Sequence, residues 1–170
     1  MPVGKEIIIF TDGACLGNPG PGGYAAVLTY KGKRKEISGG FRLTTNNRME
    51  LKAVIEALRT INSPEKYKIN IYTDSRLIVN AFNQGWLEKW AAKGWVRKSN
   101  EKVQNSDLWK EFLNLANGLN LEINWVEGHS GVPENERCDI LSKEEAMKSN
   151  LPSDIVYEQE KGLQIFLNDD

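Results

Sequence analysis

The chain has 170 residues, of which 40% are hydrophobic and 26% charged, and its net charge is −1. This size and composition are typical of one globular domain and exclude an intrinsically disordered protein. No apolar run approaches the roughly 20 residues that cross a bilayer, and the first residues lack the pattern of a secretory signal. We therefore expect a cytoplasmic protein with no membrane contact, in which Cys15 and Cys138 are reduced thiols.

Charge is unevenly distributed along the chain. The segment from Trp86 to Lys102 contains five basic residues and two glutamates, so its net charge is +3. The remainder of the chain therefore has a net charge of −4. The basic residues are Lys89, Lys93, Arg97, Lys98 and Lys102. Such asymmetry is typical of a surface that faces a polyanion, although a solvated helix face would have the same composition.

The first half of the chain predicts three strands and a helix. Alternating apolar and β-branched residues predict strands at 5–11, 24–30 and 35–42, and the turn-rich segment 13–23 predicts an irregular loop. The period then changes to that of a helix, for which the candidate N-caps are Thr44, Thr45 and Asn46. Its apolar stripe consists of Val54, Ala57, Leu58 and Ile61.

The second half continues with strands at 68–74 and 121–126 and with helices at 75–82, from 105 and from 133. This order predicts an α/β fold, a mixed five-stranded sheet with helices on both faces. Its first three strands are antiparallel, and helical crossovers join the later ones. We expect one domain over 1–150 and a loosely attached tail over 151–170, in which 155–159 and 163–167 could pair locally.

Two of the predicted strands end in the same dipeptide, Thr-Asp. Asp12 follows the first strand and Asp74 follows the fourth. The carboxyl ends of strands that feed helical crossovers gather at one edge of a sheet, so both carboxylates are expected in one crevice. Taken singly, either aspartate is more typical of a turn or a helix cap.

Two further acids lie on predicted helices. Glu50 shares a helix face with Val54 and Ala57, and a buried carboxylate needs a cation, a proton or a metal ion. A glutamate stabilised by the dipole of the first helical turn is the alternative. Asp139 lies on the helix that follows the loop of His129, and by itself it would be interpreted as a surface acid.

Four converging acids without a basic partner would repel one another, and a divalent cation removes that conflict. We therefore predict a metal site formed by Asp12, Glu50, Asp74 and Asp139. Ligands that are oxygen only favour Mg²⁺, with Mn²⁺ as the alternative, over zinc. Because Mg²⁺ shares its ligand shell with phosphate oxygens, the matching substrate is a phosphate ester. Two ions about 3.5 to 4 Å apart would activate a water and stabilise the leaving oxygen.

His129 is the single histidine of the chain and follows the fifth predicted strand. Gly128 and Gly131 on either side indicate a flexible loop at the same edge of the sheet. Imidazole exchanges protons near neutral pH, which favours a catalytic role, whereas an exposed loop histidine without a role is the alternative.

Four blocks of the sequence resemble the bacterial form of type 1 ribonuclease H. They are TDGACLGNPGPGGYAAVL, TTNNRMELKAVIEAL, YTDS and WVEGHSGVPENERCD, and the resemblance runs in order from about Ile7 to Met147. It implies that the four acids bind metal and that His129 assists proton transfer or product release. It also implies hydrolysis of the RNA strand of RNA/DNA hybrids with Mg²⁺ or Mn²⁺, leaving 5′-phosphate and 3′-hydroxyl ends.

The resemblance further implies contacts to the hybrid. Residues matching minor-groove contacts, where 2′-hydroxyls distinguish RNA from DNA, are Cys15, Asn18, Asn46 and Asn47. Thr45 and Asn105 match positions associated with a DNA-strand phosphate. A basic protrusion that grips the DNA strand by stacking and charge is matched by Trp86, Lys89, Trp90, Lys93 and Trp95. Arg76 stands where many relatives have glutamine, which leaves a minor-groove hydrogen bond in doubt and allows an added phosphate contact.

Two other functions remain open at this point. A non-catalytic hybrid-binding module of the same fold is disfavoured because none of the four acids is missing. A different metal nuclease, such as a transposase-like or junction-resolving enzyme, would place acids on a similar sheet. Nothing in the sequence demands more than a monomer.

Overall fold

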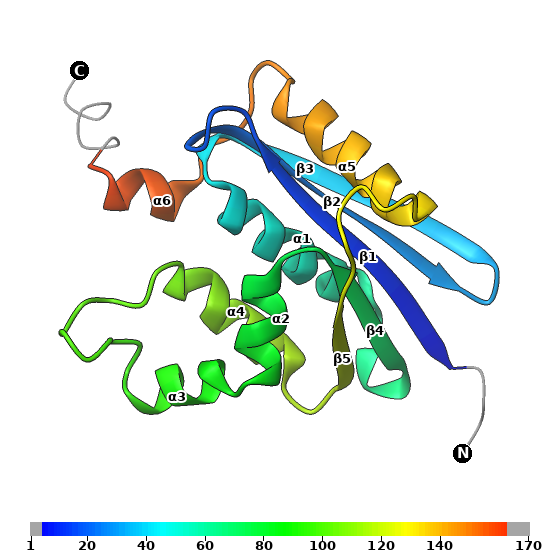
Figure 1. The fold of residues 1–170 in the computed structure, drawn as a ribbon, viewed down its shortest axis with the longest axis horizontal. Coiled ribbons are helices and arrows are strands. Elements are labelled where there is room, and N and C mark those ends of the chain that lie inside the picture. Colours follow the sequence, from blue (N-terminus) through cyan, green and yellow to red (C-terminus); the bar gives the residue numbers. More distant parts are fainter. Residues whose placement is uncertain (1–4, 163–170) are drawn as a thin grey trace.

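The computed structural model describes residues 5–162 and contains one five-stranded sheet (Figure 1). In chain order the strands are β1 (Glu6–Cys15), β2 (Gly20–Tyr30), β3 (Lys33–Thr44), β4 (Lys68–Thr73) and β5 (Asn120–Trp125). Their order across the sheet is β3-β2-β1-β4-β5. β1, β2 and β3 pair antiparallel, whereas β4 is parallel to β1 and β5 is parallel to β4. The predicted mixed sheet is therefore confirmed.

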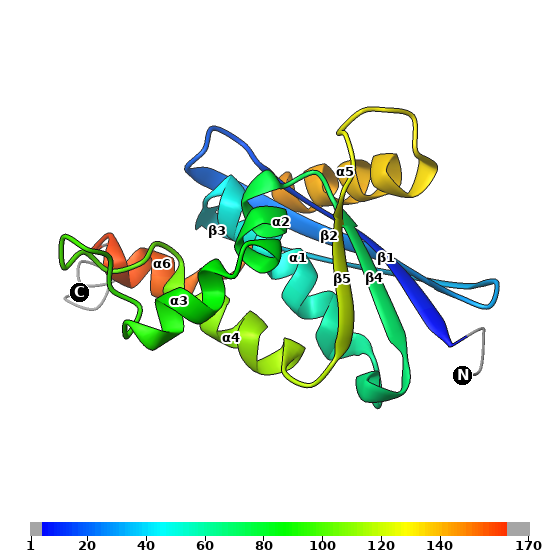
Figure 2. The ribbon, with the colours of Figure 1, turned by 60° about the horizontal axis from the view of Figure 1, so that its bottom comes forward.

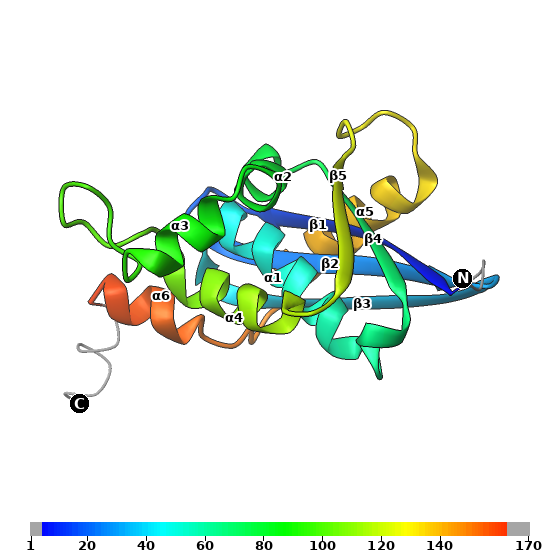
Figure 3. The same ribbon diagram turned by 90° about the horizontal axis from the view of Figure 1, so that it is seen from below.

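Helices cover both faces of this sheet. They are α1 (Asn46–Thr60), α2 (Arg76–Asn83), α3 (Trp86–Ala92), α4 (Ser106–Ala116), α5 (Pro133–Ala146) and α6 (Ile155–Glu160), with a short 3-10 helix at Pro64–Lys66. α1 packs on β1 and β2 and also on α4, and α5 packs on β1, β2 and β3 from the opposite face (Figures 2 and 3). In the described residues, none of these helices has the length and apolar character needed to cross a membrane.

The glycine-rich segment 13–23 is mostly strand, so the predicted irregular loop was wrong except at its centre. Gly13 pairs with Tyr24 in the β1–β2 ladder, and Gly23 pairs with Ala14. A Cβ atom on Gly13 would lie 2.4 Å from the backbone nitrogen of Glu50, and one on Gly23 would lie 2.0 Å from the carbonyl oxygen of Ser142. These glycines therefore mark places where α1 and α5 approach the strands closely, rather than turns.

The core lies between α1 and the sheet and extends to α4. Val54, Ala57 and Leu58 of the predicted apolar stripe are buried, and they join a cluster with strand residues such as Ile9 and Ile71. Packing of the stripe against the sheet sets the rotation of α1 about its axis. Glu50, one turn before Val54, is consequently held on the same buried face.

Residues 151–162 are attached to the domain, contrary to the predicted loose tail. Segment 155–159 forms part of α6 rather than a strand, and the other predicted pairing segment, 163–167, lies outside the described residues. Asp154 and Glu158 are buried, because Arg48 and Arg42 respectively form ion pairs with them. Neutralisation by these arginines makes burial of the two acids possible.

Candidate active site

Three of the predicted acids meet at one edge of the sheet. A carboxylate oxygen of each of Asp12, Glu50 and Asp74 lies within 4.8 Å of the other two. β1 and β4 are parallel neighbours in which Phe10 is paired with Tyr72, so the aspartates two residues further on lie side by side. Asp12 lies within β1, which continues to Cys15, whereas Asp74 directly follows the end of β4. The expected position of Asp12 after its strand was therefore wrong, but the expected convergence of the two aspartates is confirmed.

Glu50 completes this cluster from α1. The helix begins after Thr45, whose Oγ1 accepts the backbone N–H of Arg48 at 3.3 Å. The absence of a side chain at Gly13 lets the first turn of α1 lie against β1. Glu50 is 5% exposed, and its Oε2 has no hydrogen-bond partner in the described part of the chain. A buried carboxylate oxygen without a partner is costly unless a cation binds there.

The protonation of the cluster reflects this crowding. Burial, together with the charge of Asp74, raises the pKa of Asp12 from 3.8 to about 7. The pKa of Glu50 lies well above its usual value because of burial and of the charges of Asp12 and Asp74. Burial also raises the pKa of Asp74. The three groups therefore resist simultaneous ionisation, and a divalent cation bound between them would remove the penalty.

Asp139 lies at the margin of the cluster. It is half-buried on α5 and its Oδ2 accepts a hydrogen bond from Lys143 Nζ at 2.9 Å. It is not among the acids whose oxygens lie within 4.8 Å of one another, yet its charge contributes to the raised pKa values of Asp12 and Asp74. The structure thus places the fourth predicted ligand near the three others without bringing it into contact with them.

The loop that carries His129 lies over Asp74. A Cβ atom on Gly128 would be 2.8 Å from Asp74 Oδ2, so the loop backbone contacts this carboxylate. His129 itself is exposed, with a left-handed backbone conformation at a φ of 58°. Whereas burial raises the pKa of Asp74, the charge of His129 acts in the opposite direction. The predicted position of this histidine beside the acids is borne out.

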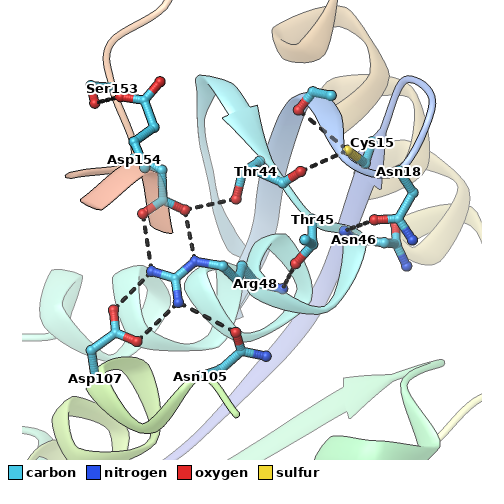
Figure 4. Close-up of polar contacts among 12 residues, drawn as sticks. Cys15, Asn18, Thr44, Thr45, Asn46, Arg48, Asn105, Asp107, Ser153 and Asp154 are labelled. Atoms are coloured by element: carbon cyan, nitrogen blue, oxygen red, sulfur yellow. Dashed lines mark hydrogen bonds and ion pairs between the residues drawn. The ribbon is translucent and has the colours of Figure 1, made fainter. Parts of the chain in front are cut away.

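Several of the predicted hybrid contacts gather around the start of α1 (Figure 4). Asn18 Oδ1 accepts the backbone N–H of Asn46 at 3.0 Å, which ties the β1–β2 loop to the helix. The Cys15 Sγ lies 3.4 Å from each of the carbonyl oxygens of Gly20 and Thr44, to which its single S–H can donate. The neighbouring Asn47 is exposed. These short polar side chains therefore come from the end of β1, the β1–β2 loop and the first turn of α1, the helix that also carries Glu50.

The basic, tryptophan-rich segment borders an open cavity of about 670 Å³. Its lining includes Trp86, Lys89, Trp90, Lys93, Arg97, Lys98 and Asn105. The rings of Trp86 and Trp90 are in tilted contact, with 6.1 Å between their centroids and 50° between their planes, and both pack against the core. They therefore contribute to the core as well as to the cavity. Trp95 does not line this cavity; Lys110 Nζ lies 5.8 Å from its ring centroid. A cavity lined by tryptophan rings and by lysine and arginine side chains suits the bases and phosphates of a nucleic-acid strand.

Two features near the site were missed from sequence. The Arg76 guanidinium stacks on the exposed ring of Trp125, 4.1 Å from its centroid, where β5 ends. Arg48 is 2% exposed and forms ion pairs with Asp107 and Asp154. The burial of Arg48 could have been predicted from the helical period, because Arg48 shares a helix face with the apolar residues Leu51, Ile55 and Leu58, which are buried. An arginine on an apolar stripe must find acidic partners.

The RNase H family model matches residues 4–147. The chain belongs to the ribonuclease H family. Curated relatives named Ribonuclease H include that of Desulforamulus reducens, 56% identical over 151 residues, which are 89% of this chain and 94% of that protein. Another, from Rippkaea orientalis, is 51% identical over 94% of this chain and 96% of that protein. The predicted enzyme class is therefore confirmed: this chain is a ribonuclease H.

Solved ribonuclease H structures share its fold. LC9-RNase H1, described as a type 1 RNase H with the type 2 active-site motif, has a TM-score of 0.75 at 35% identity, covering 86% of this chain and 74% of that one. LC11-RNase H1 in complex with RNA/DNA hybrid has a TM-score of 0.59 at 27% identity, covering 81% of this chain and 94% of that one. The resemblance to type 1 ribonuclease H found in the sequence blocks is thus confirmed.

Proposed function

We propose that this ribonuclease H is an endonuclease that hydrolyses the RNA strand of RNA/DNA hybrids by divalent-metal-assisted attack of water, leaving 5′-phosphate and 3′-hydroxyl ends. The observation that carries the proposal is the meeting of Asp12, Glu50 and Asp74 within 4.8 Å, with one buried Glu50 oxygen lacking a partner. The hybrid bound to the relative LC11-RNase H1 supports the substrate. We further propose that the enzyme acts in the cytoplasm as a monomer.

The residues fit a hard divalent cation. Asp12, Glu50 and Asp74 would hold it, and Asp139 would complete the site from α5. Carboxylate oxygens without cysteine or histidine favour Mg²⁺, and Mn²⁺ is the alternative ion. When bound, the cation supplies a water activated for attack on phosphorus and charge stabilisation for the leaving oxygen.

The protein's own groups hold these acids in place. The backbone N–H of Gly13 donates to Asp12 Oδ1 at 2.9 Å, which orients that carboxylate. The backbone at Gly128 limits the position of Asp74. His129, on the exposed loop beside Asp74, would take up or deliver the proton that the reaction exchanges with solvent.

Substrate recognition would combine groove reading with phosphate binding. Cys15, Asn18, Asn46 and Asn47 would contact the minor groove of the hybrid, where a 2′-hydroxyl donates and accepts hydrogen bonds. Phosphates of the DNA strand would contact Thr45 and Asn105, and the strand would continue over Trp86, Lys89, Trp90, Lys93 and Trp95. Arg76 would add a phosphate contact, since its stack on the exposed ring of Trp125 holds the guanidinium in one position.

A cleavage assay tests the function directly. Labelled RNA/DNA hybrid, duplex DNA, duplex RNA and branched DNA are incubated with the enzyme in Mg²⁺, and only the RNA strand of the hybrid should be cut. Asp12→Asn should abolish cleavage while retaining hybrid binding. The matched control is Glu65→Gln. Glu65 is an exposed acid that precedes β4, so it lies at the opposite end of that strand from Asp74. Absence of hybrid cleavage, or equal cutting of duplex or branched DNA, would overturn the proposal.

A further inference from the structure

Arg48 is the centre of a buried ion-pair network that joins three distant segments of the chain (Figure 4). Its Nε and Nη2 donate to Asp154 at 2.7 and 3.0 Å, and its Nη1 and Nη2 donate to Asp107 at 2.9 and 2.8 Å. A fifth hydrogen bond runs from Nη1 to Asn105 Oδ1 at 3.3 Å. All five N–H donors of the guanidinium are therefore used, which fixes its plane and its position.

The fifth hydrogen bond links this network to the basic cavity. Asn105 precedes α4 in a left-handed conformation, and its side chain does not cap that helix. It lines the cavity that Lys89, Lys93 and Arg97 also border. Because Arg48 binds the carbonyl oxygen of the Asn105 amide, the Nδ2 group of the same amide is turned away from Arg48, as Figure 4 shows. An amide donor beside a cationic cavity is suited to a phosphate oxygen.

The C-terminal segment 151–162 holds Arg48 from the other side. Asp154 precedes α6 and also accepts the hydroxyl hydrogen of Thr44 at 2.7 Å, next to the N-cap of α1. Further along α6, Glu160 forms an ion pair with Lys102 at 3.0 Å. The segment thus contacts both the start of α1 and Lys102, which precedes the cavity-lining residue Val103.

Burial of these charges is not explained by stability alone. Replacing a buried ion pair by apolar residues of similar volume is often neutral or stabilising, because the attraction barely offsets the lost hydration. A bidentate guanidinium does, however, impose a fixed geometry that apolar contacts do not. The network therefore has the properties of a positioning device.

We propose that Arg48, held by Asp154 and Asp107, positions the amide of Asn105 for a phosphate of the bound nucleic acid, so that Asp154 of the C-terminal segment contributes through Arg48 to the enzyme's affinity for its substrate. This inference rests on the proposed function. Arg48 is then a positioning residue that acts through Asn105. Residues 151–162 take part in binding only indirectly, because Asp154 holds Arg48 in place. The acidic cluster does not take part in the network, so the affinity for Mg²⁺ is independent of it.

The decisive variant is Arg48→Lys, which keeps the charge but loses the planar fork. With the RNA/DNA hybrid as substrate, KM should rise about tenfold, the effect of one charge-assisted hydrogen bond, while kcat and the Mg²⁺ dependence stay unchanged. The matched control is Arg42→Lys, because Arg42 makes the same two-bond pair to Glu158 of α6 without contacting Asn105. It should lower the melting temperature without changing KM. A KM rise of the same size in Arg42→Lys would overturn the inference.

A double variant tests whether Arg48 acts through Asn105. Asn105→Ala should raise KM, and adding Arg48→Lys to it should raise KM no further, since the two residues form one unit. Additive increases would refute the positioning role. If Arg48→Lys does not fold, Asp154→Asn replaces it in the same comparison.

The side-chain amide signals of Asn105 in NMR spectra of the free protein provide a readout that needs no substrate. They should shift in Arg48→Lys and Asp154→Asn but not in Arg42→Lys, and unshifted signals would overturn the inference. Failure of the wild-type enzyme to cut the hybrid would instead refute the proposed function. In that case the NMR shifts of the Asn105 amide would still show whether Arg48 positions it.

Discussion

Replacing Asp12 by asparagine is expected to stabilise the metal-free enzyme at pH 8 while abolishing its activity. Burial and the charge of Asp74 raise the pKa of Asp12 from 3.8 to about 7. This rise corresponds to a penalty of about 4 kcal/mol on the folded state when the group is ionised. Asparagine is isosteric, and its Oδ1 still accepts the hydrogen bond that the Gly13 N–H donates. The substitution therefore removes the penalty without loss of packing.

The pH dependence follows from the direction of the pKa shift. Below pH 3.8 both the folded and the unfolded chain hold the proton, so Asp12 contributes no difference. Between pH 3.8 and about 7 only the folded state retains it, and the wild type loses stability progressively as the pH rises. Above pH 7 the full penalty is present. The advantage of Asp12→Asn should thus be absent at pH 3.5 and reach about 4 kcal/mol at pH 8.

Urea denaturation in EDTA, from pH 3.5 to 8.5, measures this difference. In thermal denaturation it should appear as an increase in Tm of about 10 °C at pH 8. The matched control is Asp139→Asn, whose carboxylate is half-buried and already pairs with Lys143, and whose effect should be much smaller. Mg²⁺ at 100 times its Kd should stabilise the wild type by about 2.7 kcal/mol but should stabilise Asp12→Asn much less. A stability gain that is equal at all pH values would refute the electrostatic reasoning.

Three further substitutions test the surroundings of the site. Gly128→Ala should lower kcat about a hundredfold, because the new Cβ displaces the Asp74 carboxylate. The free energy of unfolding should change by less than about 1 kcal/mol, and kinetics and urea denaturation measure the two effects separately. His129→Ala should lower kcat only about tenfold, less than the loss of an obligatory general base, and complete inactivity in the cleavage assay would contradict an assisting role. Gly23→Ala should destabilise the protein by roughly 3 kcal/mol in urea denaturation, since the carbonyl oxygen of Ser142 on α5 cannot turn away from the added methyl group. An unchanged denaturation midpoint would contradict this close packing.

Much of the candidate site followed from local patterns. The Thr-Asp dipeptides of two predicted parallel strands indicated that two carboxylates lie together at one place in the sheet. Asp74 does follow the end of β4, whereas Asp12 lies inside β1, and the register of the two strands brings the carboxylates together. The helical period around Val54 indicated that Glu50 faces inward. The hybrid contacts at the start of α1 came instead from the resemblance to a family, and their roles stay predictions.

Other features were not readable locally because they depend on what packs against them. Gly13 and Gly23 had the composition of a turn, and only the close approach of α1 and α5 explains why they lie in strands. Trp125 and Arg76 are distant in sequence, and their stack depends on the pairing of β4 with β5.

The sequence by itself determined the strand and helix periods, the two Thr-Asp dipeptides and the inward face of α1, because each depends on residues close together in the chain. Only the tertiary structure decided that Asp139 stands at the margin of the acidic cluster and that residues 151–162 are an attached part of the domain. Both depend on pairings across long sequence separations, of which Arg48 with Asp154 is the clearest. A buried guanidinium needs acidic partners, but the partners that it takes are determined by the folded chain.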